Sequence, residues 1–217
     1  MILPIAEVLN ASELAQVCGL LSDAPSLDGR HSAGWAAAEV KRNSQFDLQS
    51  EQVQKANELI SAKIKANPLI KQAAFAAKYT PMMLSRYRAG QQYGSHVDDV
   101  WQSGVRTDLA YTLFLSNPEQ YSGGELRLHD HAGTQDFKLA AGSLLLYPAS
   151  TLHEVCAIES GERLAAVGWI ESRVRDHELR GALFDLDLVR RNLHQTGDAA
   201  GYSSLSRVFG VLARRAQ

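Results

Sequence analysis

Residues 87–100 read YRAGQQYGSHVDDV and place His96 two positions before Asp98, after a run with two glycines and two tyrosines. In an extended segment, residues i and i+2 point to the same side, so an imidazole nitrogen and a carboxylate oxygen could face one point. A metal site would explain this pair. The pair alone is weak evidence, because the chain has seven histidines and many aspartates, and a solvated polar loop is the more ordinary explanation.

Short β-rich runs follow one another around and after this stretch, and turn signals separate most of them. The runs are MMLSRYR (82–88), TDLAYTLFLS (107–116), GELRLHD (124–130), GTQDFKL (133–139), GSLLLYP (142–148), TLHEVCAI (151–158) and RLAAVGWIES (163–172). The turn signals are NPEQYSGG (117–124), HAG (131–133), AAG (140–142), YPAS (147–150) and ESGE (159–162). Many short strands at steady spacing favour a β-sandwich or barrel, and a jelly roll fits this pattern.

Helical patterns flank the β-rich region on both sides. Apolar residues recur at helical spacing in ASELAQVCGLLS (11–22), and again at Val53, Ala56, Ile60 and Ile64. After residue 173 two further stripes appear, formed by Leu183, Leu186, Val189 and Leu193 and by Tyr202, Leu205, Phe209 and Leu212. We therefore expect an α+β protein with an N-terminal helical flank (1–80), a jelly-roll core (81–172) and a C-terminal helical extension (173–217).

Composition excludes several classes of protein. The chain has 217 residues, 45% of them hydrophobic and 21% charged, with a formal net charge of −2, so it is globular and gives no reason to expect nucleic acid or an anionic membrane as partner. It lacks an apolar run of about 18 residues, the length a membrane span requires. The N-terminus is a poor signal peptide, and Cys18 and Cys156 form no CxxC pair. These features predict a cytoplasmic protein.

A third candidate ligand strengthens the metal interpretation of the opening stretch. His153 lies in the strand-like segment TLHEVC. Two histidines and one carboxylate would form a facial triad with open coordination positions, which suits non-haem Fe(II) enzymes that activate oxygen. The second local cluster, HDH at 129–131, precedes AGT at an expected hairpin tip, so we expect a solvated turn there.

Arg163 lies ten residues after His153, across the expected turn ESGE, so the two residues could occupy neighbouring antiparallel strands. Alternation would place Arg163 on one strand face with Val167 and Trp169. A buried arginine there would need a partner, and a carboxylate matches its planar fork. No acidic residue shares that face, so the partner could be a ligand. A solvated arginine, or one paired with protein, explains the residue about as well.

These motifs together resemble the Fe(II)/2-oxoglutarate-dependent dioxygenases of the prolyl hydroxylase type. The resemblance runs through SRYRAGQQYGSHVDD, RTDLAYTLFLSNPEQYSGGELRL, AGSLLLYPASTLHEV and RLAAVGWIESRVRD. DGRHSAGWAAAEVKRNSQ and ALFDLDLVRRNL are also similar to one bacterial branch, the PKHD-type hydroxylases. The resemblance covers nearly the whole chain and implies a double-stranded β-helix, a jelly-roll variant, with Fe(II) at its mouth.

The resemblance also implies a role for individual residues. His96, Asp98 and His153 match the metal ligands, Arg163 matches the residue that binds the distal carboxylate of 2-oxoglutarate, and Tyr87 matches a position that assists it. Positions that match the lining of the co-substrate pocket are Thr112, Leu126 and Trp169. At the substrate mouth the expected residues are Tyr93 and Trp101. Ascorbate is an additional candidate, as reductant.

Two rival functions stay open at this point. A cupin-like barrel could use the same ligands without 2-oxoglutarate, and Arg163 and Tyr87 would then have no dicarboxylate to hold. A non-catalytic barrel is the other rival, and the intact ligand set speaks against it. Expected partners are O₂ and a small-molecule or peptide substrate, with a weak link to iron acquisition and siderophores, and a homodimer through the C-terminal helices.

Overall fold

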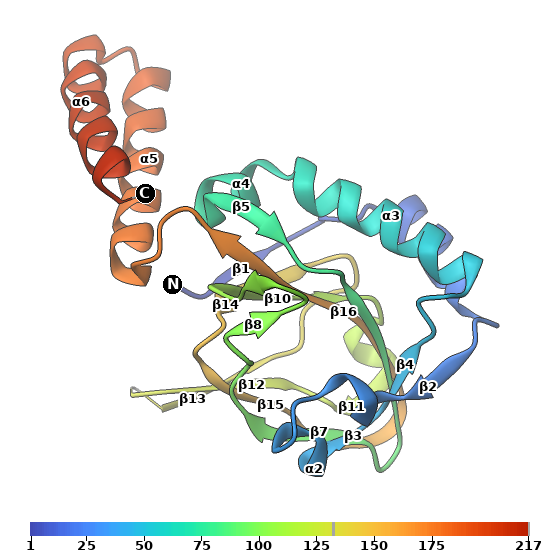
Figure 1. The fold of residues 1–217 in the computed structure, drawn as a ribbon. Helices are drawn as coiled ribbons and strands as arrows, with labels where there is room; N and C mark the ends of the chain where they lie inside the picture. The colour runs from blue at the N-terminus through green and yellow to red at the C-terminus, as the bar shows by residue number, and fades with distance from the viewer. Residues whose placement is uncertain (132, 217) are drawn as a thin grey trace.

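The structure is a computed structural model that describes residues 1–131 and 133–216. Its centre is formed by two antiparallel β-sheets that face each other (Figure 1). The larger sheet contains, in spatial order, β1 (Leu3–Ile5), β14 (Leu144–Pro148), β10 (Leu109–Phe114), β16 (Ile158–Ser172), β6 (Met83–Arg88), β4 (Ser44–Phe46) and β2 (Ser26–Asp28); β5 (Ala76–Tyr79) and β11 (Tyr121–Gly123) also pair with β16.

The smaller sheet contains residues 92–96 of the stretch 87–100, whereas Tyr87 and Arg88 end β6 of the larger sheet. Its strands are, in order, β13 (Gly133–Phe137), β12 (Leu126–Asp130), β15 (Leu152–Val155), β7 (Gln92–His96) and β3 (Lys41–Arg42). A separate hairpin of β8 (Trp101–Gln102) and β9 (Val105–Arg106) follows β7. The two sheets together form the expected jelly roll, so the predicted fold class is confirmed.

Helices cover one face of the larger sheet and extend the chain at its C-terminus (Figure 1). The α-helices are α1 (Ala11–Leu21), α2 (Ala37–Val40), α3 (Glu51–Ala66), α4 (Pro68–Ala74), α5 (His177–Gln195) and α6 (Ala199–Arg215), and two 3₁₀ turns are η1 (Gly29–Ser32) and η2 (Pro118–Gln120). Side chains cap several of these helices. Asn10 and Glu13 form a capping box on α1, Asn67 caps α4, and Asp176 caps α5.

Side-chain alternation along the strands divides the core into two clusters. On β10, Tyr111 and Leu113 pack with α1, α3 and α4, whereas Ala110 and Phe114 face the space between the sheets. The predicted stripe Val53, Ala56, Ile60 and Ile64 is fully buried in the first cluster. A cavity lined by both polar and apolar residues adjoins the second cluster.

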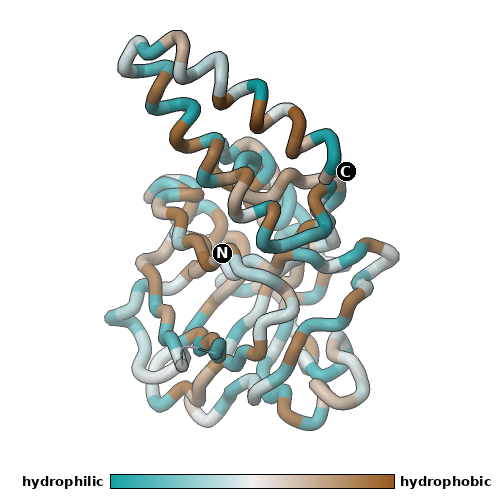
Figure 2. Tube along the Cα trace, turned by 90° about the vertical axis from the view of Figure 1, so that its left-hand side faces the viewer, coloured by the Kyte–Doolittle hydropathy of each residue, from teal (hydrophilic) through white to brown (hydrophobic). Residues whose placement is uncertain are grey.

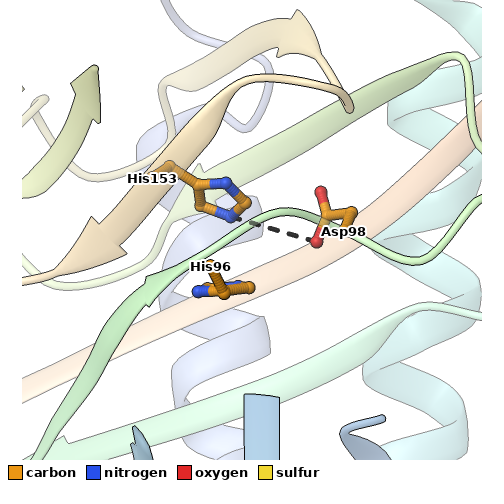
Figure 3. Close-up of side chains that lie close together, drawn as sticks. All are labelled: His96, Asp98 and His153. Carbon is orange, nitrogen blue, oxygen red and sulfur yellow. Dashed lines mark ion pairs between the residues drawn. The ribbon is translucent and has the colours of Figure 1, made fainter. Parts of the chain in front are cut away.

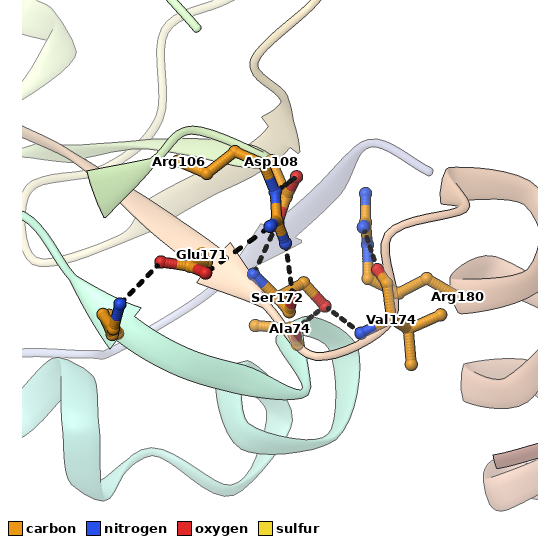
Figure 4. A network of polar contacts seen from close by, with 8 residues as sticks. Ala74, Arg106, Asp108, Glu171, Ser172, Val174 and Arg180 are labelled. Carbon is orange, nitrogen blue, oxygen red and sulfur yellow. Dashed lines mark hydrogen bonds and ion pairs between the residues drawn. The ribbon is translucent and has the colours of Figure 1, made fainter. Parts of the chain in front are cut away.

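A buried polar network joins the end of β16 to its surroundings (Figure 4). Arg106 donates to both carboxylate oxygens of Asp108 and to the Ser172 carbonyl, at 2.8–2.9 Å. The Ser172 hydroxyl donates to the Ala74 carbonyl at 2.7 Å and accepts from the Val174 amide at 3.1 Å. The network therefore links β9, the residue before β10 and the end of β16 with the end of α4 and the segment that leads into α5.

The C-terminal helices form a hairpin that projects away from the sheets (Figures 1 and 2). α5 packs against α4, and Phe75 stacks on Phe209 of α6 with ring centroids 6.4 Å apart. Hydrophobic and hydrophilic residues alternate along the hairpin (Figure 2). Four of its apolar residues are exposed by 42–52%: Leu188, Val189, Val208 and Val211.

The structure corrects two sequence-based expectations. The turn predicted at ESGE (159–162) is wrong, because β16 runs without reversal from Ile158 to Ser172. Gly161 has φ of +79° and pairs with Tyr121, so the glycine bends the strand instead of ending it. The N-terminal flank, which was expected to be helical, also contains β1 to β5. Ala132 of the expected HAG turn, and Gln217 of the expected extension, lie outside the described residues.

Candidate metal and co-substrate site

Three side chains converge at the open end of the space between the sheets. β7 supplies His96, the segment after it supplies Asp98, and β15 supplies His153, which pairs with His96 in the strand register. One ligand atom from each residue lies within 4.8 Å of the others. His153 Nε2 is 3.9 Å from Asp98 Oδ1 (Figure 3). Among residues 1–131 and 133–216, this is the one group of three or more such side chains with that geometry.

Backbone carbonyls orient both imidazole rings. His96 Nδ1 lies 2.8 Å from the Gly94 carbonyl, and His153 Nδ1 lies 2.9 Å from the Thr151 carbonyl. A carbonyl oxygen only accepts, so each Nδ1 carries a proton, and the neutral form of each ring has its free lone pair on Nε2. This arrangement fixes the ring orientation that a metal-binding histidine requires.

Burial disfavours charge on His96 and on Asp98 in the absence of a cation. Burial, and to a lesser degree His153, lowers the pKa of His96 to about 3. Burial also raises the pKa of Asp98 above its usual range, against the opposing effect of His153. Asp98 Oδ2 has no hydrogen-bond partner among the described residues. A bound divalent cation would stabilise the carboxylate and supply the missing partner.

Arg163 lies in the same cavity and is 1% exposed. Its guanidinium carbon is 5.3 Å from the ring centroids of Tyr87 and Phe114. Nε and Nη2 have no hydrogen-bond partner, and no carboxylate of the described chain lies within ion-pair distance. A buried cation with free donors requires an anion, and a planar carboxylate fits its fork.

The predicted pocket residues gather around these two centres, with one exception. The larger sheet contributes Tyr87, Thr112 and Trp169, and the smaller sheet contributes Tyr93 and Leu126; all five line the cavity. Tyr87 lies directly opposite Arg163 in the β6–β16 register, and Tyr93 stacks on His96 with ring centroids 3.7 Å apart. Trp101 is 61% exposed on the β8–β9 hairpin and does not line the cavity.

The expected placement of His153 and Arg163 on neighbouring strands is wrong. β15 pairs with β12 and β7 in the smaller sheet, whereas β16 belongs to the larger one. The chain crosses between the sheets at Cys156–Ala157, immediately before β16 begins. The two residues consequently face one cavity from opposite sheets, which brings a metal site and a carboxylate site together.

The cavity is also lined by residues that the sequence analysis did not predict, among them Tyr147 and Lys41. Tyr147 is buried, and its ring meets His153 edge-on at 5.3 Å. Lys41, on β3, is 3% exposed. Burial lowers the pKa of Lys41 to about 8. Tyr147 could have been predicted as a lining residue from its position in the expected strand GSLLLYP. Lys41 lies in a polar segment without periodicity, which gives no such signal.

Comparison with known proteins identifies the family. Residues 82–171 match the sequence profile of the 2OG-Fe(II) oxygenase superfamily. A PKHD-type hydroxylase of Synechococcus sp. (strain JA-2-3B'a(2-13)) is 43% identical over 220 residues, which covers 99% of this chain and 98% of the relative. The chain belongs to the PKHD-type hydroxylases. The family resemblance inferred from the motifs is thereby confirmed.

Solved structures agree on the fold of this PKHD-type hydroxylase. A Pseudomonas putida prolyl-4-hydroxylase has a TM-score of 0.56 at 19% identity and covers 79% of this chain and 92% of its own. A prolyl hydroxylase of Trichoplax adhaerens, solved with a peptide fragment of hypoxia inducible factor, has a TM-score of 0.59 at 16% identity. The match covers 80% of this chain and 85% of the Trichoplax protein. No helix in the described part of the chain is both long and apolar enough to cross a membrane.

Members of this family use Fe(II) and 2-oxoglutarate, and the residues present fit both. Two imidazoles and a carboxylate form the donor set of a facial Fe(II) site. The unpaired Asp98 oxygen and the free Arg163 donors are the groups that a cation and a dicarboxylate require. The chain is therefore a dioxygenase by family. Iron and co-substrate supply the oxidising chemistry when bound, while the protein binds, orients and excludes water.

Proposed function

We propose that this chain hydroxylates a small molecule or peptide at the His96–Asp98–His153 site, with 2-oxoglutarate converted to succinate and CO₂. The single observation that carries the proposal is the joint position of the triad and of the unpaired Arg163 in one cavity. A metalloenzyme without a dicarboxylate co-substrate would have no use for a buried arginine with free donors.

The roles proposed for the cavity residues follow from their positions. His96, Asp98 and His153 would bind the metal, and Arg163 would bind the distal carboxylate, with the Tyr87 hydroxyl beside it. Thr112, Leu126 and Trp169 would enclose the co-substrate on both sides. Burial supports this assignment, since Arg163, Thr112 and Leu126 are each 1–2% exposed and a water-poor site strengthens the charge pairing.

The test is an anaerobic titration of the purified protein with Fe(II) and 2-oxoglutarate, followed by visible spectroscopy. We expect a weak metal-to-ligand charge-transfer band in the parent. Asp98→Ala should abolish it by removing a metal ligand, and Arg163→Ala should shift its appearance to at least tenfold higher 2-oxoglutarate because a charged hydrogen-bond partner is lost.

Arg127→Ala is the matched control for Arg163→Ala, since half-buried Arg127 pairs with Asp136 outside the cavity. The control should give the parent band. Absence of the band in the parent, despite confirmed iron binding, would refute the use of 2-oxoglutarate at this site and favour the cupin-like alternative.

The location of the enzyme and its link to metabolism are also proposed. We propose a cytoplasmic enzyme, on the ordinary composition and the two unpaired cysteines. A substrate linked to iron or siderophore metabolism and a requirement for ascorbate are further parts of the proposal. Turnover assays with and without ascorbate, scored by succinate formation, test the last point directly.

The C-terminal hairpin is proposed as a homodimer contact. Its exposed apolar residues, named above, lie on helices that project from the body. Buried against a second copy, such residues would each contribute hydrophobic free energy. We propose in addition that residues 1–80 flank the catalytic core of 81–172 and that the extension after 173 serves assembly instead of catalysis.

A further inference from the structure

Lys41 is a buried cation that the proposed reaction does not use. It is 3% exposed and lies on β3, opposite Tyr93 of β7 in the strand register. Its Nζ donates to Ser32 Oγ at 2.9 Å and lies 4.8 Å from the Tyr93 ring centroid. An ammonium has three N–H donors, and the other two have no acceptor among the described residues.

The surroundings of Lys41 do not neutralise its charge. No carboxylate of the described chain lies within 4.0 Å of Nζ. Asp98 acts on Lys41 at longer range, and burial still lowers the pKa of the lysine to about 8. A buried ammonium of this kind is costly unless a ligand pairs with it. The side chain also lines the cavity that contains the triad.

Charge balance within the loaded site points to the substrate as that partner. The two charges of Fe(II) and the charge of Arg163 are matched by Asp98 and by the two carboxylates of 2-oxoglutarate. Lys41 is the cation left over. The other carboxylate lining the cavity, Asp99, is exposed and lies against Gly34, without an ion pair to Lys41. One further negative charge would therefore be stabilised near Lys41.

An apolar surface continues outward from the same wall. A groove lined by Trp35, Val40 and Val97 adjoins the cavity and shares His96 with it. These three apolar side chains are exposed by 89%, 36% and 49%. Exposed apolar side chains around a cavity mouth are typical of ligand-binding grooves. A cation inside and an apolar wall outside match a molecule with a charged end and an apolar body.

We propose that Lys41 anchors the substrate by binding a carboxylate group whose apolar body lies along Trp35, Val40 and Val97. The inference rests on the proposed function and names the class of its substrate, an amphipathic carboxylic acid. Lys41 contacts Tyr93, which stacks on His96, so a group bound there lies close to the metal ligands.

The experiment measures binding, which separates it from turnover. The protein is loaded with Zn(II) and saturating 2-oxoglutarate, so that Arg163 is occupied and no oxidation occurs. Isothermal titration calorimetry then compares 3-phenylpropionate with its uncharged amide, 3-phenylpropionamide. We expect the acid to bind the parent about tenfold more tightly than the amide, as a charge-assisted hydrogen bond predicts.

Three variants locate the effect. Lys41→Met, similar in length and uncharged, should bind acid and amide equally, and Lys41→Arg should keep part of the preference. Lys138→Met is the matched control, since Lys138 Nζ lies 4.2 Å from the Tyr121 ring outside the cavity, and it should keep the full preference.

Several results would overturn the proposal. In the parent, equal affinities for acid and amide, or no binding of either probe, would refute it. In Lys41→Met, a preference for the acid that survives would refute it as well. A loss of 2-oxoglutarate affinity in Lys41→Met would place Lys41 in the co-substrate site instead. The Fe(II)/2-oxoglutarate band of the same proteins, loaded anaerobically with Fe(II) in place of Zn(II), reports separately on the proposed function. A normal band without acid preference refutes the Lys41 anchor alone.

Discussion

His96 and His153 are prepared for a cation by hydrogen bonds to the backbone carbonyls of Gly94 and Thr151. Each bond fixes the tautomer that leaves Nε2 free, and burial keeps His96 neutral at low pH. A metal ligand must be deprotonated, so this environment favours binding. The same environment lowers the free energy of unfolding of the metal-free protein in acid, because folded His96 stays unprotonated.

The lowered pKa of His96 should make the stability of the metal-free protein depend on pH. Because the pKa of His96 falls from 6.5 to about 3 on folding, the unfolded chain takes up a proton below pH 6.5 that the folded chain does not. The free energy of unfolding should therefore fall as pH decreases from 6.5 toward 3. Urea denaturation in EDTA measures it, and His96→Gln should show a shallower fall. An unchanged slope in His96→Gln would contradict the assigned environment.

Gly124 allows Arg163 to occupy its position. A Cβ at Gly124 would lie 2.2 Å from Ile158 Cδ1 and 3.2 Å from Arg163 Cδ, and φ is +69°. Gly124→Ala should thus displace the arginine and raise KM for 2-oxoglutarate on the order of tenfold, with Zn(II) affinity unchanged. Gly90→Ala is the control, since Gly90 has φ of +81° and open space around it. Equal effects in both variants would indicate backbone strain alone.

The sequence predicted the donor set and several residues that line the cavity, but it did not predict Lys41. His96, Asp98 and His153 were predictable because a short spacing and a strand-like segment carry a ligand pattern. Lys41 was not predictable, because it is buried by long-range contacts with Ser32 and Tyr93, and no local sequence pattern indicates such contacts.

Among the elements, β16 determines how the site is assembled. It pairs with β6 and β10 and carries Arg163 and Trp169 into the cavity. Strand periodicity predicted the run from Arg163 to Ser172. The start of the strand was missed because Gly161, in a turn-like ESGE sequence, reads locally as a reversal, and its pairing with Tyr121 is a long-range contact.

Ser172, at the end of β16, should be important for stability. Its buried hydroxyl holds the Ala74 carbonyl and the Val174 amide. Ser172→Ala leaves both groups unpaired, at a cost of about 1–3 kcal/mol, and should lower Tm by roughly 2–10 °C. Thermal unfolding by circular dichroism measures this. Exposed Ser122→Ala, which loses one bond to Glu159, should change Tm by less than about 2 °C; a similar loss in both would refute the network's role.

On the scale of the whole molecule, the jelly roll and the helical hairpin are distinct parts with different exposure of apolar surface. The barrel buries its apolar faces in two clusters, whereas α6 has no buried residue. The sequence predicted both helices of the hairpin from their stripes. It could not show that Val189, within one stripe, is 52% exposed, because periodicity does not say what covers a face.

Assembly through the hairpin is therefore open to a direct test. Sedimentation velocity at micromolar concentration should show a dimer for the parent and a monomer for Val189→Lys/Val208→Lys, because a buried charge disfavours the contact. Leu27→Lys, at an exposed apolar residue on β2, is the matched control and should stay dimeric. A monomeric parent would refute the dimer and leave the catalytic account untouched.

The most direct test of the triad and of Arg163 is a crystal structure with Mn(II) and 2-oxoglutarate, in which anomalous scattering locates the manganese. We expect one strong peak bound by His96 Nε2, Asp98 and His153 Nε2, with the far carboxylate of 2-oxoglutarate on Arg163. A peak at His129 or His131 instead, or a co-substrate that does not reach Arg163, would contradict this assignment.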